Sequence, residues 1–486
     1  MDKRNLFTET LTAQKMRDRL ETKLLSLRKQ RQFDFLMKKR LTRSLPRSQF
    51  TLTNSYEKFI DLLSQSLIDE KIKILSNKEI TLYTKDKTRK NIYDQNIIKI
   101  VINDLYLNTH NEEYITVLLD IIYICSLKGI QSEEELYSER MAEMLIYTIP
   151  KEHDDNVNIV DLAFLIFGNL SLTKNSFFKE KYVMYIVYLV NKETIANLST
   201  RNYLLWNIRI YLSNNVTNQN RQLMISIVQC LNKIMNIVDS NQSEKVIKDI
   251  ITNLLNTYLL LSKISNDALK QEIFDSNVLS NIVSIIAKHN LNIENDEYAF
   301  QFLIHFFTVE NSIDLINKDV IDVLSKTMTK YKSCCNDDLR IYQILLTFLS
   351  LLITKCNFDY INYIFNSEII SLLFTSYIHQ PLFIEDVLDV FVSIINTKNK
   401  DYIVYILNKG ILSYIRNEIQ LDRKNIDVII KLLSIFHSLL LFYKKFDIAL
   451  CAIDDDKVNH KLEQLSISNN EHISELSREC YYIINN

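Results

Sequence analysis

The chain has almost no glycine or proline, with three of each in 486 residues. Tight β-hairpins and phosphate-binding loops require positive φ angles, which glycine adopts most readily. So few turn formers exclude an all-β or βαβ architecture. Connections between α-helices tolerate Asn, Ser, Asp and Lys instead, so the sequence predicts an all-α fold.

Motifs of enzymes and metal proteins are also missing. Three isolated glycines supply neither a Walker loop nor a G-x-G-x-x-G motif, which excludes the usual nucleotide-binding enzymes. The eight histidines show no H-x-x-x-H or H-E-x-x-H spacing, and the aspartates at 454–456 lack the spacing of an EF-hand loop. The seven cysteines, an odd number without C-x-x-C spacing, are typical of reduced core residues. We expect no enzyme activity, no catalytic residues, no cofactor and no metal site.

Long hydrophobic runs are the third absence. Apolar stretches such as 345–353 are interrupted by Thr and Ser, and they fall short of the roughly 18 residues that a membrane-spanning helix needs. Residues 1–10 mix charged and polar side chains and lack the apolar core of a secretory signal. We therefore expect no membrane span and a location in the cytosol or nucleus.

What the chain does contain is helical periodicity. From residue 56 onward apolar side chains recur three and four residues apart, and apolar residues make up 47% of the sequence. This spacing of apolar helices is typical of armadillo or HEAT repeats, in which one helix per repeat lines a concave binding surface. A general helical domain with accidental spacing is the alternative. The strongly apolar helices are centred 41 to 50 residues apart, near Leu119, Leu165, Trp206, Asn256, Gln301, Phe348, Val392 and Ser434.

Charge is unevenly spread along the chain. Residues 1–47 carry 14 Lys and Arg against 5 Asp and Glu, about +9, whereas the remainder has 43 basic and 54 acidic residues, about -11. The sequence thus joins a basic arm, residues 1–47, to an acidic helical body, residues 48–486. Basic arms also contact nucleic acid or anionic lipid, but this arm has few interleaved aromatic side chains, which disfavours both partners.

The arm carries the pattern of a known family. Residues 27–40, Leu-Arg-Lys-Gln-Arg-Gln-Phe-Asp-Phe-Leu-Met-Lys-Lys-Arg, closely resemble the second half of the importin-β-binding segment of importin-α. Residues 163–171 and 404–412 are similar to repeat motifs of that family, and residues 462–484 resemble its last armadillo repeat. The chain therefore resembles a divergent importin-α (karyopherin-α) over most of its length.

The resemblance implies a nuclear import adaptor that shuttles between cytoplasm and nucleus. Such an adaptor links cargo bearing a basic nuclear localisation signal to an importin-β-like carrier, and an export receptor is a further implied partner. The implied fold is a right-handed armadillo superhelix of about eight to ten repeats over residues 48–486. The end of the arm would also mimic cargo and occupy the adaptor's own groove. The implied carrier-binding residues are Arg17, Arg19, Arg28, Lys29, Arg31, Lys38, Lys39 and Arg40.

Importin-α proteins bind signal peptides with Trp-x-x-x-Asn pairs, because side chains four residues apart share one helical face. Asn amides hold the peptide backbone, and indoles hold cationic side chains. Here that ladder is eroded, since the aligned pairs are Leu119/Tyr123, Leu165/Asn169, Trp206/Ile210, Gln301/His305, Phe348/Leu352 and Val392/Asn396. The residues assigned to the cargo-peptide groove are Leu165, Asn169, Trp206, Val392 and Asn396.

Three questions about the groove stay open at the level of sequence. Trp206 can instead be a core residue, with the register shifted by one, and Asn396 can instead end a helix. The eroded ladder also favours a second function, an armadillo scaffold that has left nuclear transport and anchors a structural complex. The intact basic segment of the arm opposes that second function.

Overall fold

The computed structural model describes the chain mainly from residue 95 onward, and every regular element in the described ranges is a helix. The basic arm, with all of its predicted carrier-binding residues, lies outside these ranges. The described residues are 68, 71, 95–128, 134–173, 177–191, 197–214, 220–238, 244–263, 276–308, 315–332, 339–378, 383–421, 425–446 and 456–485.

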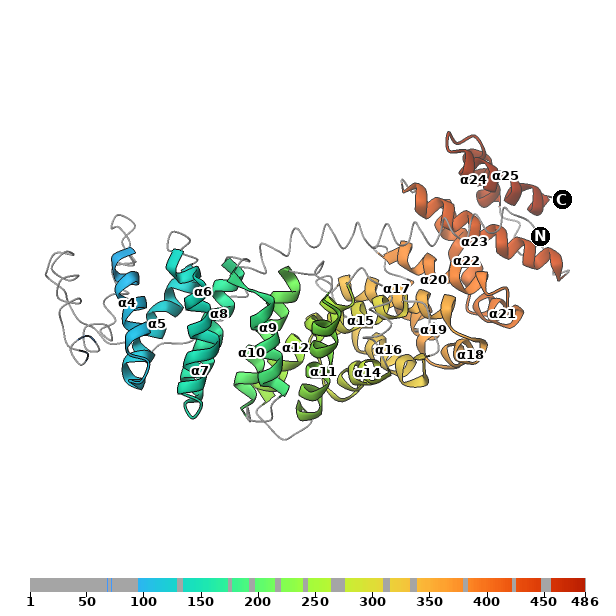
Figure 1. Ribbon diagram of the computed structural model, residues 1–486. Helices are drawn as coiled ribbons and strands as arrows, with labels where there is room; N and C mark the ends of the chain where they lie inside the picture. Colours follow the sequence, from blue (N-terminus) through green and yellow to red (C-terminus); the bar gives the residue numbers. More distant parts are fainter. Residues whose placement is uncertain are drawn as a thin grey trace. The chain divides into compact units, whose positions relative to one another are not determined.

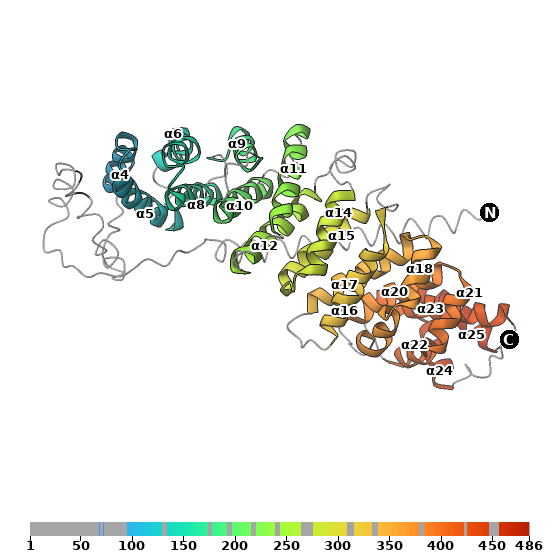
Figure 2. The same cartoon turned by 90° about the horizontal axis from the view of Figure 1, so that it is seen from below.

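The first of two compact units is Met1–Asn215. Its long helices stack in sequence order, α5 on α8 and α8 on α10, and shorter helices form a second row against them (Figures 1 and 2). We call the long helices the inner row, because α8 and α10 are buried on nearly every side. The inner row is α5 (Glu112–Lys128), α8 (Val157–Thr173) and α10 (Leu198–Asn214); the outer row is α4 (Gln95–Leu107), η2 (Glu134–Tyr137), α6 (Glu139–Glu143), η3 (Met144–Thr148), α7 (Ile149–Glu152) and α9 (Glu180–Asn191).

The second unit, Val216–Asn486, repeats the same arrangement. Each inner helix packs on the next one along the chain, and each is flanked by outer helices. The inner row is α12 (Glu244–Leu261), α15 (Ile293–Thr308), α17 (Leu339–Lys355), α20 (Ile384–Asn396), α23 (Ile426–Lys445) and α25 (Glu471–Asn485). The outer row is α11 (Arg221–Val238), α14 (Ser276–Lys288), α16 (Lys318–Tyr331), α18 (Phe358–Asn366), α19 (Ile369–Leu372), η7 (Leu373–Tyr377), α21 (Lys400–Asn408), α22 (Ile411–Gln420) and α24 (Asp456–Ser466).

The predicted repeat spacing corresponds to successive inner helices. Each of the eight apolar centres found in the sequence falls within a different inner helix, from Leu119 in α5 to Ser434 in α23. Each period therefore contributes one inner helix and its outer partners, as in an armadillo-type stack. The prediction of an all-α, armadillo-type solenoid is confirmed.

Asparagine residues cap the N-termini of several helices in a chain that has few glycine and proline residues. The side chains of Asn317, Asn357, Asn399 and Asn425 each accept a hydrogen bond from a backbone N–H in the first turn of α16, α18, α21 or α23. An asparagine cap satisfies an N–H group that the helix leaves unpaired and stabilises it by about 1 kcal/mol. Short links without glycine can therefore start new helices, and Gly410 is used where the turn needs a φ of 92°.

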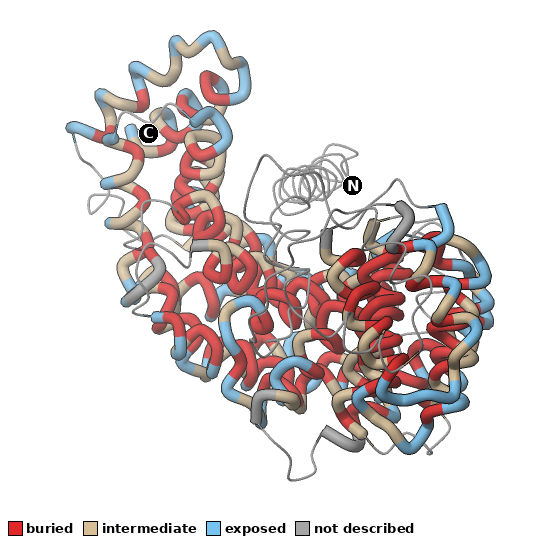
Figure 3. The backbone as a smooth tube through the Cα atoms, turned by 90° about the vertical axis from the view of Figure 1, so that its left-hand side faces the viewer, coloured by how far each residue is buried: buried red, intermediate tan, exposed pale blue. Residues whose placement is uncertain are grey.

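Helix α23 is long and apolar enough to cross a membrane by length and composition alone. It nevertheless packs against α20, α22 and α25, with Leu433, Phe436 and Leu440 fully buried. Figure 3 shows such buried residues inside the stacked helices and exposed residues on their outer turns. The apolar character of α23 is thus explained by its place in the core of the second unit.

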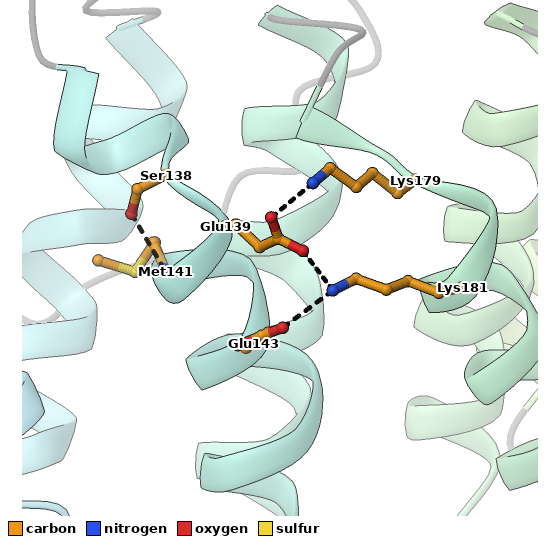
Figure 4. A network of polar contacts seen from close by, with 6 residues as sticks. All are labelled: Ser138, Glu139, Met141, Glu143, Lys179 and Lys181. Atoms are coloured by element: carbon orange, nitrogen blue, oxygen red, sulfur yellow. Dashed lines mark hydrogen bonds and ion pairs between the residues drawn. The ribbon is translucent and has the colours of Figure 1, made fainter.

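An ion-pair network joins neighbouring outer helices of the first unit (Figure 4). Glu139 of α6 accepts a hydrogen bond of 2.6 Å from the Lys179 ammonium, and it also pairs with Lys181. Lys181 in turn contacts Glu143 at 2.9 Å. The hydrogen bonds from Lys179 and Lys181 lower the pKa of Glu139 from 4.5 to about 2.

The network should be visible in the titration of the Glu139 carboxyl group, whereas its effect on the free energy of unfolding should be small, because ion pairs on the surface contribute little to stability. With its folded pKa depressed, Glu139 contributes stability above pH 4.5, and this contribution is lost as the pH falls toward 2. We expect an NMR titration of the carboxyl carbon to give a midpoint near 2, and near 4.5 once Lys179 and Lys181 are both methionine. A midpoint near 4.5 in the unmodified chain would show that the network does not form in solution.

Candidate peptide-binding face

The inner helices α5, α17, α20 and α23 each leave one stripe of their surface less buried than the rest, whereas the middle parts of α8, α10, α12 and α15 are buried all round. On α20 the stripe is Glu385, Asp389, Val392 and Asn396, spaced four, three and four residues apart. This spacing is one face of an α-helix. In the second unit α17, α20 and α23 pack on one another in sequence order, and we call their three stripes together the open face.

Of the predicted ladder pairs, Val392 and Asn396 lie on the less buried stripe of α20. Val392 is half-buried and Asn396 is exposed at the end of α20, which leaves both roles proposed for Asn396 possible. On α15, Gln301 is 8% exposed and His305 is half-buried. Val392, Asn396 and His305 therefore keep some exposed surface, whereas Gln301 is buried.

Two other pairs were placed one residue out of register. Leu119 and Tyr123 of α5 are buried, and the less buried positions are Asp120 and Ile124. Phe348 and Leu352 of α17 are fully buried as well, and the stripe there contains Thr347 and Leu351. The sequence could not distinguish these positions, because inner helices are apolar around most of their circumference and have only a weak amphipathic signal.

Trp206 is a packing residue in this structure. It is 2% exposed, and it lies directly against Gly168 of α8, where an added Cβ would lie 2.1 Å from the indole Cζ3 atom. The neighbouring Asn207, which sequence reasoning missed, donates a hydrogen bond of 3.0 Å to the carbonyl of Phe164. This arrangement supports the core alternative for Trp206 and links α10 to α8.

Leu165 and Asn169 of α8 are also buried, with 3% and 2% of their surfaces exposed. Neither the oxygen nor the nitrogen of the Asn169 side chain has a hydrogen-bond partner in the described part of the chain. An unpaired buried amide costs about 1–3 kcal/mol per polar group. A peptide backbone, with one donor and one acceptor per residue, has the groups that this amide lacks.

Polar contacts one repeat apart connect neighbouring inner helices, and these were not foreseen. Asp161 of α8 accepts hydrogen bonds from Ser199 and Thr200 of α10, at 2.6 and 2.5 Å. In the second unit, Ser350 of α17 contacts Ser393 of α20 at 2.8 Å. In the sequence, polar residues that recur at the repeat period are the signal that could have predicted these contacts between inner helices.

Polar and charged side chains also meet between neighbouring inner helices of the second unit. Glu297 of α15 lies 3.4 Å from Arg340 of α17, and His437 of α23 lies 3.3 Å from Glu479 of α25. Acidic residues of one helix are thus matched by side chains of the next. A basic peptide on these helices must compete with internal partners.

Asp296 shows how the two rows are held together. Burial raises the pKa of this carboxyl group, while hydrogen bonds from Lys330 and Tyr331 of α16, at 2.7 and 2.8 Å, oppose the increase. A buried carboxylate with two donors is stable because its charge and lone pairs are satisfied. Asp296 therefore serves packing of α15 on α16 and is unavailable to a ligand.

Comparison with known proteins identifies the fold. No family model and no curated protein matches the chain. Among solved structures, an engineered protein aligns with a TM-score of 0.61 and 12% identity, covering 89% of this chain and 100% of its own. A structure from work on the phosphorylation switch between cadherin and β-catenin gives 0.50 and 10%, covering 89% and 99%. A designed armadillo repeat protein in complex with the peptide (KR)4 gives 0.38 and 14%, covering 52% and 99%.

Likeness at such low identity establishes architecture and no more. The resemblance of the arm to importin-α is a property of the sequence alone, since no family model matches. The chain is an all-α solenoid of the armadillo type, in which stacked inner helices are flanked by a row of outer helices.

Proposed function

We propose that this protein is an importin-α-like adaptor rather than an enzyme. Its basic arm binds an importin-β-like carrier, and its open face takes an extended basic signal peptide of nuclear cargo. The observation that carries the proposal is the gap-free resemblance of residues 27–40 to an importin-β-binding segment, joined in one chain to an armadillo-type solenoid. Neither feature alone would favour transport over a general scaffold.

The arm suits a partner that surrounds it with acidic groups. Its Arg and Lys side chains would point in nearly all directions around a helix, so the isolated helix is only marginally stable. A carrier that encloses the helix can form many charge-assisted hydrogen bonds at once, and these offset the cost of ordering it. Shuttling between cytoplasm and nucleus follows from carrier binding.

Particular residues of the inner helices support the cargo half of the proposal. The buried amide of Asn169 has no hydrogen-bond partner among the described residues, and Val392 and Asn396 lie together on the stripe of α20. The body of the chain is also acidic, which attracts a basic peptide over distance. Trp206 contributes by holding α8 and α10 together rather than by stacking on the peptide.

A pull-down with purified importin-β tests the carrier half. We expect importin-β to retain the full chain and not the chain lacking residues 1–47. The remaining body is acidic, so it has no basic segment for the acidic groups of the carrier to bind. The fold of both chains is checked by circular dichroism. Equal retention of both chains would overturn the proposal, since the arm would then have no part in binding.

Removal of the arm also has an expected effect on cargo. The arm is about +9 and the body about -11, so the arm competes for the open face at high local concentration. We expect deletion of residues 1–47, or alanine at Lys38, Lys39 and Arg40, to raise the affinity for a basic signal peptide about tenfold at low salt. The difference should shrink as salt is added. Equal affinities at low salt would mean that the arm serves the carrier alone.

A scaffold outside nuclear transport is the second candidate. The burial of Trp206 and the internal pairing between inner helices favour it, because both reduce the groups available to a peptide. A scaffold would retain partners without the arm and would not bind importin-β. The pull-down with and without residues 1–47 therefore separates the two functions.

A further inference from the structure

The stripe of α20 contains an acidic pair that is already occupied. Glu385 and Asp389 are four residues apart, so their carboxylates lie on one face of the helix. The ammonium of Lys431, from the next inner helix α23, pairs with Asp389 and lies 3.7 Å from the nearest oxygen of Glu385. The Nζ atom itself is buried.

The surroundings hold this lysine in place. The side chain of Lys431 is 17% exposed, and those of Glu385 and Asp389 are 24% and 23% exposed. Partial burial strengthens the attraction between such charges, because less water screens them. On the other flank of α20, Ser350 of α17 contacts Ser393 at 2.8 Å, so α20 is tied to both neighbours.

Two carboxylates four residues apart on a helix can together bind a lysine or arginine side chain of a peptide. Here a residue of the chain itself provides the cation. An incoming basic side chain must displace a lysine that is already desolvated and tethered, which is unfavourable. Val392 and Asn396, farther along the same stripe, remain half-buried and exposed.

We propose that Lys431 is a specificity-determining residue, an internal cation that excludes lysine and arginine side chains from the α20 segment of the open face. This segment then selects a stretch of ligand with uncharged side chains, held at Val392 and Asn396, and basic side chains must bind elsewhere. The proposal rests on the proposed function, because it assumes that the open face binds an extended peptide.

Replacement of Lys431 tests the exclusion. The change Lys431→Met removes the charge and keeps the length of the side chain, so the acidic pair loses the internal cation with which a peptide side chain would compete. We expect the affinity for fluorescent (Lys-Arg)4 to increase about tenfold at physiological salt, and the affinity for (Gln-Ser)4 to stay unchanged. Adding Glu385→Gln and Asp389→Asn should abolish the gain, and Lys431→Arg should behave like the unmodified chain.

Matched controls separate a specific site from a change in net charge. Lys444→Met removes one positive charge from an exposed position on the same helix, and it should leave both affinities unchanged. If Lys431→Met does not fold, Glu385→Gln with Asp389→Asn leaves Lys431 in place without its partners. That variant should then bind (Glu)8 about tenfold more tightly than the unmodified chain.

The outcomes distinguish this proposal from the proposed function. If the unmodified chain binds (Lys-Arg)4 and Lys431→Met binds it equally, Lys431 excludes nothing, while peptide binding stands. If only Lys431→Met binds, the exclusion is supported and the unmodified chain is not a receptor for basic peptides. If neither chain binds, both proposals are overturned.

Discussion

Replacing Gly168 with alanine is expected to destabilise the first unit by about 3 kcal/mol, although the same change within a helix normally stabilises by about 1 kcal/mol. The reversal of sign comes from Trp206, because a Cβ on Gly168 would lie 2.1 Å from Cζ3 of the indole, and both residues are buried. The ring cannot move aside into solvent, so α8 and α10 must separate. Chemical denaturation measures the loss, and hydrogen exchange locates it.

The location of the loss is a prediction in its own right. Repeats pack only on their neighbours, so protection should fall in α8 and α10 while that of α17 and α20 is kept. Asn158→Ala, at an exposed position near the start of α8, is the matched control and should change stability by less than about 0.5 kcal/mol. Adding Trp206→Leu to Gly168→Ala should recover part of the loss. A stabilised Gly168→Ala chain would mean that the two residues are not in contact.

Reversing the charge of Arg28, Lys29 and Arg31 together is expected to reduce affinity for an importin-β-like carrier more than about 100-fold. Removing one partner of an enclosed, hydrogen-bonded charge pair costs about 2–5 kcal/mol, and each reversal also adds repulsion against the acidic carrier. We expect the solenoid to remain folded, because these residues belong to the basic arm defined from the sequence and lie outside the described helices. A titration at physiological salt measures the change.

The control for this change keeps the net charge equal. Glutamate at Lys409, Lys444 and Lys445, all exposed on the second unit, makes the same difference in charge without altering the arm. This control should retain carrier binding within a few-fold. Equal losses in both variants would show that the carrier responds to the overall charge of the chain, and the resemblance of the arm would lose its functional meaning.

Much of the architecture could be predicted because its causes are local. The scarcity of glycine and proline and the 3.6-residue period of apolar side chains act within single helices. Each of the apolar centres from Leu119 to Ser434 therefore falls within a different inner helix. Helix starts at Asn357 and Asn399 follow the same logic, since an asparagine cap bonds only to the turn that follows it.

The site was less accessible to sequence reasoning. Val392 and Asn396 fall on the less buried stripe of α20, because α20 has a strongly one-sided apolar pattern. Phe348 and Leu352 were placed one residue away from theirs, because α17 is apolar on most sides and a shift of one changes little in the pattern. The role of Trp206 could not be settled either, since packing against Gly168 depends on how closely two helices approach.

The sequence by itself therefore determined the helices, their repeat period and the separation of a basic arm from an acidic body, because periodicity and composition are properties of consecutive residues. Only the tertiary structure decided which inner helices leave one side open and which polar groups are already paired. Lys431 and Asp389 are 42 residues apart in the chain, and no local rule brings them together. Stacking of α20 on α23 does so, because side chains on adjacent inner helices meet at positions that the packing of whole repeats sets.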